Sequence, residues 1–114
     1  MEKIKPLLPS LREKKRYVAF EIVSEKPVNI KQASSVIFDS ARKYVGVKGL
    51  ALMGLIVLDE KFKKNKGILK VNVKHVNTLK ACFCLAKEID SQPIILKSLG
   101  VSGVLQKIDK FTAS

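Results

Sequence analysis

Histidine, tryptophan and cysteine are scarce in this chain of 114 residues. It holds one histidine, no tryptophan and two cysteines, and it has neither a Gly-rich phosphate loop nor a Cys-x-x-Cys motif. With His75 as the only imidazole, neither a Cys/His dyad nor a histidine-based metal site can be assembled. Cys82 and Cys84 point about 200° apart on a predicted helix, which places Cys82 in the core and Cys84 on the surface. The composition therefore argues against self-contained catalysis.

Long apolar runs are also missing. The longest, residues 50–58, falls well short of the ~20 residues that a membrane-spanning helix needs. The first ten residues carry charges and two prolines where a signal peptide would have an unbroken apolar stretch. Two cysteines in a lysine-rich chain without an export signal indicate reduced thiols rather than a disulfide framework. We expect a soluble, cytoplasmic protein.

Positive charge is what the chain has in excess. Lysine and arginine number 22 against 10 aspartates and glutamates, which gives a formal net charge of +12. A surplus of this size on a small domain attracts polyanions. Lysine-rich surfaces that serve thermostability usually carry matching glutamates, and the acids here are too few for that role. The charge favours nucleic acid over a membrane surface as the partner, and we expect no membrane contact.

The hydrophobic pattern predicts one domain, residues 17–114, after a basic arm, residues 1–16. Alternating residues predict strands, and residues at steps of three and four predict helices. The strands are expected at 17–25, 50–58, 68–73 and 94–99, and the helices at 30–44 (capped by Asn29), 76–89 and 104–111 (capped by Ser102). This order predicts an α+β fold of the ferredoxin-like or RNA-recognition-motif-like kind, a four-stranded antiparallel sheet with helices on one face plus a short C-terminal helix.

Two basic clusters are candidates for RNA contact. They are Arg12, Lys14, Lys15 and Arg16 in the arm, and Lys61, Lys63, Lys64 and Lys66 in the turn between the two middle strands. Each cluster either meets phosphates or is a solvated run of charge. Readout of single-stranded RNA on such a sheet needs aromatic rings on the central strands, and residues 66–73 offer aliphatic or polar side chains instead. We expect contacts to the backbone or the shape of a folded RNA.

The apolar run at 50–58 suggests a second surface. As a strand it would be apolar on both faces, although the two main helices can cover only one. The candidates for a protein interface on the other face are Met53, Leu55, Ile56 and Val57. Alternatively, the C-terminal helix folds over the sheet through Leu105, Ile108 and Phe111 and buries that face within the chain. The two possibilities are not exclusive.

Four segments, spread over nearly the whole chain, carry a family resemblance. They are the arm 8–17 (LPSLREKKRY), the strand 67–71 (GILKV), His75-Val76 with Lys80-Ala81, and 101–103 (VSG). Together they resemble the archaeal ribonuclease P protein component 2 family. The chain departs from the family pattern at Val104, where threonine is usual, and at two further candidate RNA contacts, Lys70 and Lys74, where arginine is common. Lysine keeps the charge there but lacks the bidentate fork of arginine.

The resemblance implies a noncatalytic subunit of ribonuclease P, the ribonucleoprotein that removes the 5′ leader from precursor tRNA. It implies that the RNA does the chemistry, so this chain belongs to an endoribonuclease holoenzyme without contributing catalytic residues. The chain would bind no cofactor or metal itself, and magnesium would be required by the RNA. The implied partners are ribonuclease P RNA, precursor tRNA through the holoenzyme, ribonuclease P component 3 in a two-plus-two heterotetramer, and the other protein subunits.

Two alternatives from other functional classes stay open at this point. One is a ferredoxin-like ligand-binding or protein-interaction module without an RNA role, which would need a pocket with convergent polar groups. The other is a metal-independent nuclease that acts alone.

Overall fold

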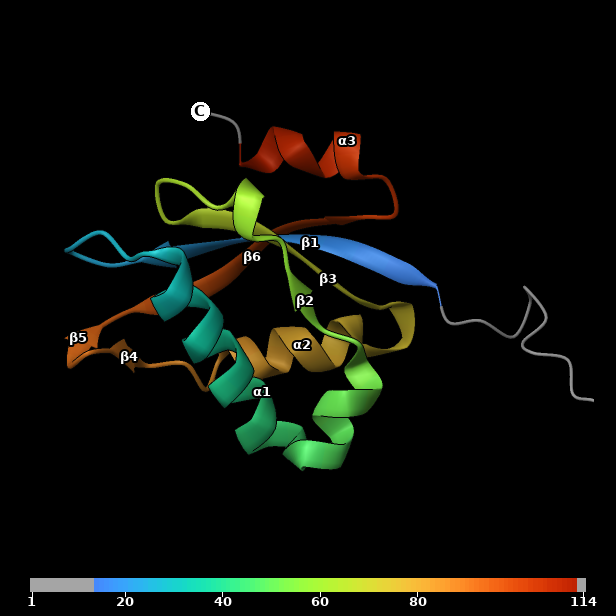
Figure 1. Ribbon diagram of the computed structural model, residues 1–114, viewed down its shortest axis with the longest axis horizontal. Coiled ribbons are helices and arrows are strands. Elements are labelled where there is room, and N and C mark those ends of the chain that lie inside the picture. Colours follow the sequence, from blue (N-terminus) through green and yellow to red (C-terminus); the bar gives the residue numbers. More distant parts are fainter. Residues whose placement is uncertain (1–13, 113–114) are drawn as a thin grey trace, which may run out of the picture.

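A computed structural model describes residues 14–112 and shows a four-stranded antiparallel sheet between two layers of helix (Figure 1). The strands are β1 (Lys15–Val23), β2 (Ile56–Val57), β3 (Lys66–Asn72) and β6 (Ile95–Ser102). They lie in the order β2-β3-β1-β6, and every neighbouring pair is antiparallel. This is the split βαβ arrangement of the ferredoxin-like fold, so the predicted fold class is confirmed.

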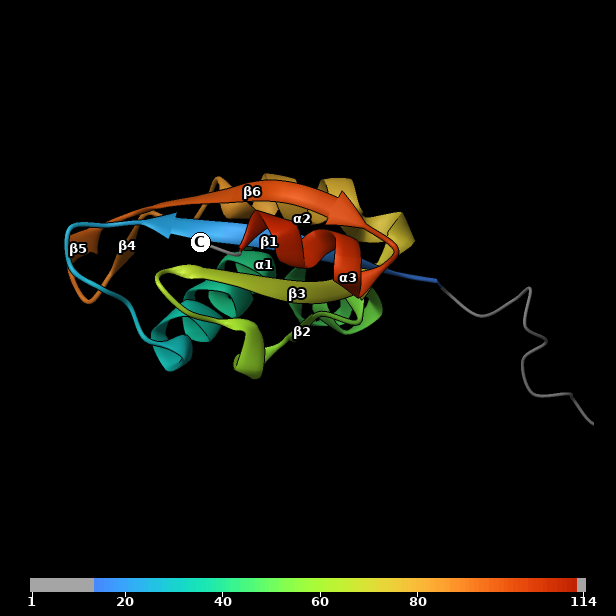
Figure 2. The ribbon, with the colours of Figure 1, turned by 90° about the horizontal axis from the view of Figure 1, so that it is seen from above.

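Helices cover both faces of the sheet. They are α1 (Ile30–Met53), α2 (Val76–Phe83) and α3 (Leu105–Ile108), which continues into the 3-10 helix η4 (Asp109–Phe111). Figures 1 and 2 show α1 and α2 on one face and α3 on the other. The main core forms on the first face, where Phe20 and Leu69 of the sheet pack with Ile37 of α1. On the second face Ile108 is fully buried with Ala19 and Ile68. The alternative in which the C-terminal helix folds over the sheet is therefore confirmed, because Ile108 and Leu105 pack on this face.

Residues 50–58, predicted as one strand, divide between the last residues of α1, which ends at Met53, and the two-residue strand β2. The helix does not end at Gly46, which has φ 78° and ψ 175°; it kinks there and resumes as far as Met53. A Cβ on Gly49 would lie 2.6 Å from the Cβ of Val45, so this close approach also requires glycine. A short apolar run does not distinguish a helix from a strand by its periodicity, because both can be buried on all sides. Within the described residues, no helix combines the length and the apolar character needed to cross a membrane.

The longer helix changes which side chains of this segment are accessible. Met53 is fully buried and Leu55 is 8% exposed, and both belong to the main core of the chain. The expectation that these two side chains face a partner is therefore corrected. Ile56 is 47% exposed and Val57 is half-buried.

The ends of the other elements also differ from the prediction. β1 begins two residues early, so Lys15 and Arg16 pair with β3 instead of belonging only to the arm. α2 ends at Phe83, and the chain then forms a small hairpin of β4 (Glu88–Ile89) and β5 (Gln92–Pro93). The Lys26 amide donates to the side-chain oxygen of Gln92 at 2.6 Å, which fastens this hairpin to the loop before α1.

The kink at Gly46 predicts that alanine at this position lowers the stability of the protein measurably. A Cβ at Gly46 would touch nothing within 4 Å, so the loss in Gly46→Ala comes from the backbone alone. The region with positive φ and extended ψ is essentially confined to glycine, and we expect the free energy of unfolding to fall by about 1–3 kcal/mol in urea titrations. Gly103→Ala is the matched control, because its Cβ would lie 3.5 Å from the nearest atom and its φ is not positive. Equal losses in both variants would contradict this account.

Candidate nucleic-acid interface

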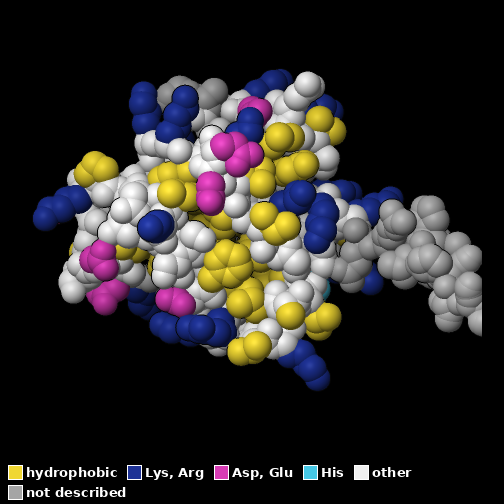
Figure 3. All heavy atoms as spheres, in the orientation of Figure 1, with side chains coloured by type: hydrophobic (Ala, Val, Ile, Leu, Met, Phe, Trp, Pro, Cys, Tyr) yellow, Lys and Arg dark blue, Asp and Glu magenta, His cyan; other side chains and the backbone are white. Residues whose placement is uncertain are grey.

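The antiparallel register gathers predicted RNA contacts at one end of the sheet. We call Lys14, Lys15, Arg16, Lys70 and Lys74 the basic end. Lys15 lies opposite Asn72, and the Val73 amide donates to the Lys14 carbonyl at 2.7 Å, so the start of β1 meets the end of β3. Lys74 follows in the 3-10 helix η3 (Val73–His75). In Figure 3 the Asp and Glu side chains of the visible face lie away from this end.

The cations of the basic end differ in what they contact. Lys15 Nζ donates to Asn72 Oδ1 at 2.6 Å, and Asn72 Nδ2 donates to the Leu52 carbonyl at 2.7 Å near the end of α1. Arg16 donates to the Lys15 carbonyl at 3.1 Å, and Lys70 Nζ lies 5.9 Å from the ring centroid of Tyr17. Lys15 thus has a structural role at the negative end of the helix dipole. The other four cations form no ion pair with any residue in 14–112. Arg12 lies outside the described residues.

The hairpin lysines lie at the opposite end of the sheet. Lys66 pairs with Glu21, and β3 separates it by about 13 Å from Lys70 and by about 20 Å from Asn72, which lies opposite Lys15. Lys61 Nζ lies 3.4 Å from Asp109 Oδ2, so this carboxylate largely offsets its charge. Lys63 and Lys64 are exposed at the tip. The two predicted clusters are therefore separate surfaces.

Asn65 holds the hairpin tip in place, and it is absent from the predicted site. Lys64 and Asn65 have φ of 54° and 62°, the conformation of a tight two-residue hairpin turn. Asn65 Oδ1 accepts from the Val28 amide at 2.9 Å, and its Nδ2 donates to the Ile22 carbonyl at 3.1 Å and to Ser24 Oγ at 2.9 Å. An asparagine between lysines in a turn could have indicated this role from the sequence, because asparagine tolerates positive φ better than most residues.

A third group of cations lies on the side of the sheet covered by α3, which we call the α3 face. Lys97 of β6 points to this face, since its partner Glu21 is two residues from Ala19. Lys107 and Lys110 of α3 and η4 are exposed. The carboxylates nearest to these lysines are Glu21, 3.9 Å from Lys97 Nζ, and Asp109, already beside Lys61. Lys107 and Lys110 could have been found as the polar side of the predicted C-terminal helix.

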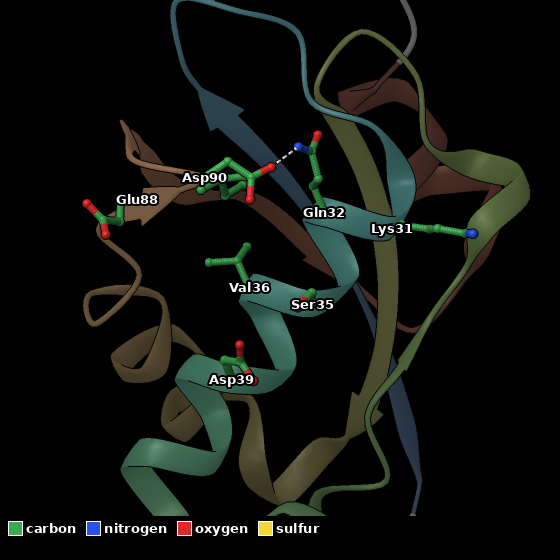
Figure 4. Close-up of a pocket in the computed structure, with 8 residues that line it drawn as sticks. Lys31, Gln32, Ser35, Val36, Asp39, Glu88 and Asp90 are labelled. Atoms are coloured by element: carbon green, nitrogen blue, oxygen red, sulfur yellow. Dashed lines mark hydrogen bonds between the residues drawn. The ribbon is translucent and has the colours of Figure 1, made fainter.

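A hollow with a volume of about 330 Å³ lies between α1 and the β4–β5 hairpin (Figure 4). Gln32 Nε2 donates to Asp90 Oδ2 at 2.5 Å across it, whereas Lys31 and Glu88 point away from it. Among the described residues, no three His, Cys, Asp or Glu side chains are placed to hold a metal ion. Because the polar groups do not converge, the hollow gives no support to the ligand-binding alternative.

The two cysteines lie as their spacing predicted. Cys82 is fully buried and Cys84 is exposed. Burial raises the pKa of the Cys82 thiol above its usual value, which disfavours the reactive thiolate. His75 stands at the N-terminus of α2 without a side-chain capping hydrogen bond.

Comparison with known proteins gives matches over nearly the whole chain. The model of the Rpp14/Pop5 family matches residues 16–113. Proteins named ribonuclease P protein component 2 from Thermococcus gammatolerans and Methanococcus vannielii are 36% and 35% identical to it, covering 96% and 95% of this chain and 91% and 82% of theirs. A chain in the cryo-EM structure of yeast ribonuclease MRP shares the fold, with a TM-score of 0.67 at 13% identity, over 82% of this chain and 77% of that one.

The hydrogen bonds of Asn65 predict different stabilities for two neighbouring glycine variants. Asn65→Gly keeps the positive φ but removes three side-chain hydrogen bonds, so we expect the free energy of unfolding to fall by about 1–3 kcal/mol. Lys64→Gly also suits positive φ and removes only an exposed side chain, so its stability should be unchanged or rise by up to about 1 kcal/mol. Urea unfolding followed by circular dichroism compares the two. A loss in Lys64→Gly as large as that in Asn65→Gly would rule out this role for the amide.

Proposed function

The chain belongs to the Rpp14/Pop5 family, and we propose that it is a noncatalytic protein subunit of ribonuclease P that binds and stabilises the RNA which removes the 5′ leader from precursor tRNA. The basic end carries this proposal. Lys14, Arg16, Lys70 and Lys74 come from two different strands and their flanks, and no described carboxylate neutralises them. A rigid frame that presents unpaired cations suits the phosphates of a folded RNA.

Charge neutralisation is the physical contribution of the protein in this proposal. Phosphates crowd together when an RNA folds compactly, and each cation that contacts a phosphate releases a condensed counterion. The subunit therefore favours the compact form of the RNA and lowers the magnesium that the RNA requires. The RNA performs the cleavage, and this chain contributes no catalytic residue to the endoribonuclease.

Lysine predominates at the basic end, and this determines which features of an RNA the basic end recognises. A lysine ammonium is a mobile point charge, whereas arginine binds a phosphate through a planar fork. Arg16 is the one guanidinium of the basic end within residues 14–112. Contacts of this kind follow the path of the RNA backbone and carry little base specificity.

We further propose that ribonuclease P component 3 packs against Ile56 and Val57, in a two-plus-two assembly that joins the other protein subunits on the RNA. Ile56 is 47% exposed, and Leu52 at the end of α1 is 59% exposed. Met53 and Leu55 lie between Leu52 and Ile56 in the sequence, and their buried side chains anchor this segment to the core. Exposed apolar side chains on a fixed backbone are typical of protein interfaces.

The salt dependence of RNA binding tests the role of the basic end. If about six phosphates are contacted, the logarithm of the affinity for ribonuclease P RNA should fall with the logarithm of the salt concentration at a slope of roughly −4 to −5. Replacing Arg16, Lys70 and Lys74 together by glutamine should make that slope shallower by about 2–3. Filter binding across a salt series measures both values.

A matched variant removes the same charge elsewhere. Lys26, Lys31 and Lys43 are exposed on the loop before α1 and on α1 itself. Their joint replacement by glutamine should leave the slope within about 1 of the wild-type value. Equal changes in the two triple variants would show that only net charge matters, and would refute a site at the basic end. The preparations should cleave precursor tRNA only when ribonuclease P RNA is present, and cleavage without it would favour the nuclease alternative.

Substitution of Ile56 tests the proposed protein interface. An aspartate there would bury an unpaired charge in the interface, so Ile56→Asp should weaken co-purification with component 3 by more than about tenfold in the absence of RNA. Val104 is also 47% exposed but lies just before α3, and Val104→Asp should co-purify normally. Circular dichroism should show both variants folded. Undiminished assembly of Ile56→Asp would exclude this surface.

A further inference from the structure

Phe111, at the end of η4, is a fixed aromatic ring that stays 45% exposed on the α3 face. Its ring lies against Gly100 of β6, where a Cβ would come within 2.7 Å of the ring atoms. Glycine thus allows the ring to rest on the strand backbone. Ile108, one turn earlier, is fully buried and holds the same helical segment to the sheet. The ring is therefore positioned from both sides while nearly half of its surface faces solvent.

Positive charge surrounds this ring. Lys110 precedes it, Lys107 is exposed one turn earlier, and Lys97 lies on the same strand and face as Gly100. The nearby carboxylates are Asp109, 3.4 Å from Lys61 Nζ, and Glu21, 3.9 Å from Lys97 Nζ, and each ion pair reduces the repulsion of an approaching phosphate. An exposed ring flanked by cations is the combination with which proteins bind single-stranded nucleic acid.

The other aromatic rings are not available in this way. Tyr17 lies on the same sheet face, but it is partly buried in the cluster under α3. Phe20 packs against Phe62 and Phe83 in the interior. Tyr44 is 54% exposed but belongs to α1, on the opposite side of the sheet. Among the rings of residues 14–112, Phe111 is the exposed one on the α3 face.

We propose that Phe111 stacks on one unpaired base of the bound RNA, while Lys97, Lys107 and Lys110 contact the flanking phosphates. This inference rests on the proposed function and adds a second contact of different chemistry. The basic end meets phosphates irrespective of pairing, whereas the Phe111 site accepts only a nucleotide whose base is free of its helix. An open sheet of this fold stacks bases on its strands; here α3 covers the strands and η4 carries the ring.

The chain contains no tryptophan, which makes a specific optical test possible. Phe111→Trp keeps a flat ring at the site, and stacking of a base should quench its fluorescence. The full-length variant is titrated with an RNA hairpin that has an unpaired loop and with a fully paired duplex of equal length. We expect quenching with the hairpin and none with the duplex. Tyr44→Trp is the matched control, and its emission should change with neither RNA.

A second pair of variants measures the contribution to affinity. Phe111→Leu keeps an apolar side chain but loses the ring, so it should bind the looped RNA roughly tenfold more weakly and the duplex as before. Phe111→Tyr should restore binding of the looped RNA. Equal quenching by both RNAs, or equal loss of affinity for both, would overturn the stacking site. If the wild-type chain binds neither RNA, the proposed function fails; if it binds both but Phe111→Trp is not quenched, only this inference fails.

Discussion

The antiparallel pairing of β1 with β3 is the interaction on which the other features depend. Its register places Lys15 opposite Asn72 at one end and Glu21 opposite Lys66 at the other. The same pairing buries Val18, Phe20 and Leu69, and this burial offsets the repulsion among the many surface cations. Shifting the register by one residue would turn these apolar side chains to the other face. The position of the positive charge is thus fixed by the requirement to bury the core.

Because α3 covers one face of the sheet, the ways in which the molecule can bind an RNA are limited. Ile108 is seated on Ala19 and Ile68, so this part of the sheet is closed to bases, and Lys107 and Lys110 are exposed on the segment that covers it. Phosphate contact is therefore the main mode of binding that the described surface offers, and its strength depends on ionic strength more than on sequence. The proposed stacking of a base on Phe111 is compatible with phosphate contact, because stacking on an aromatic ring tolerates every base.

The sequence predicted the fold better than it predicted the site. Alternation in β1 and β3 and the helical spacing of α1 sufficed for the architecture, because each pattern reflects burial on one face. The prediction for the run 50–58 failed because glycine at position 46 suggested a helix end, whereas Gly46 forms a kink and the helix resumes, with Gly49 allowing a close approach of Val45. The basic residues were visible as charge, whereas their grouping follows from strand register. Lys70 and Lys74 meet the start of β1, and the lysines of the hairpin do not.

The turn that ends α1 connects the two proposed surfaces. Gly54 has φ 61°, and a Cβ there would lie 2.5 Å from Lys15 Nζ and 2.9 Å from Asn72 Oδ1. Glycine therefore serves both the left-handed end of the helix and the approach of the Lys15 ammonium to it. Through Asn72, the same contact reaches the carbonyl of Leu52, which directly precedes the buried Met53 and lies four residues before Ile56. A side chain at Gly54 would displace the Lys15 ammonium and the Asn72 amide from the end of α1, so the two proposed surfaces share one structural support.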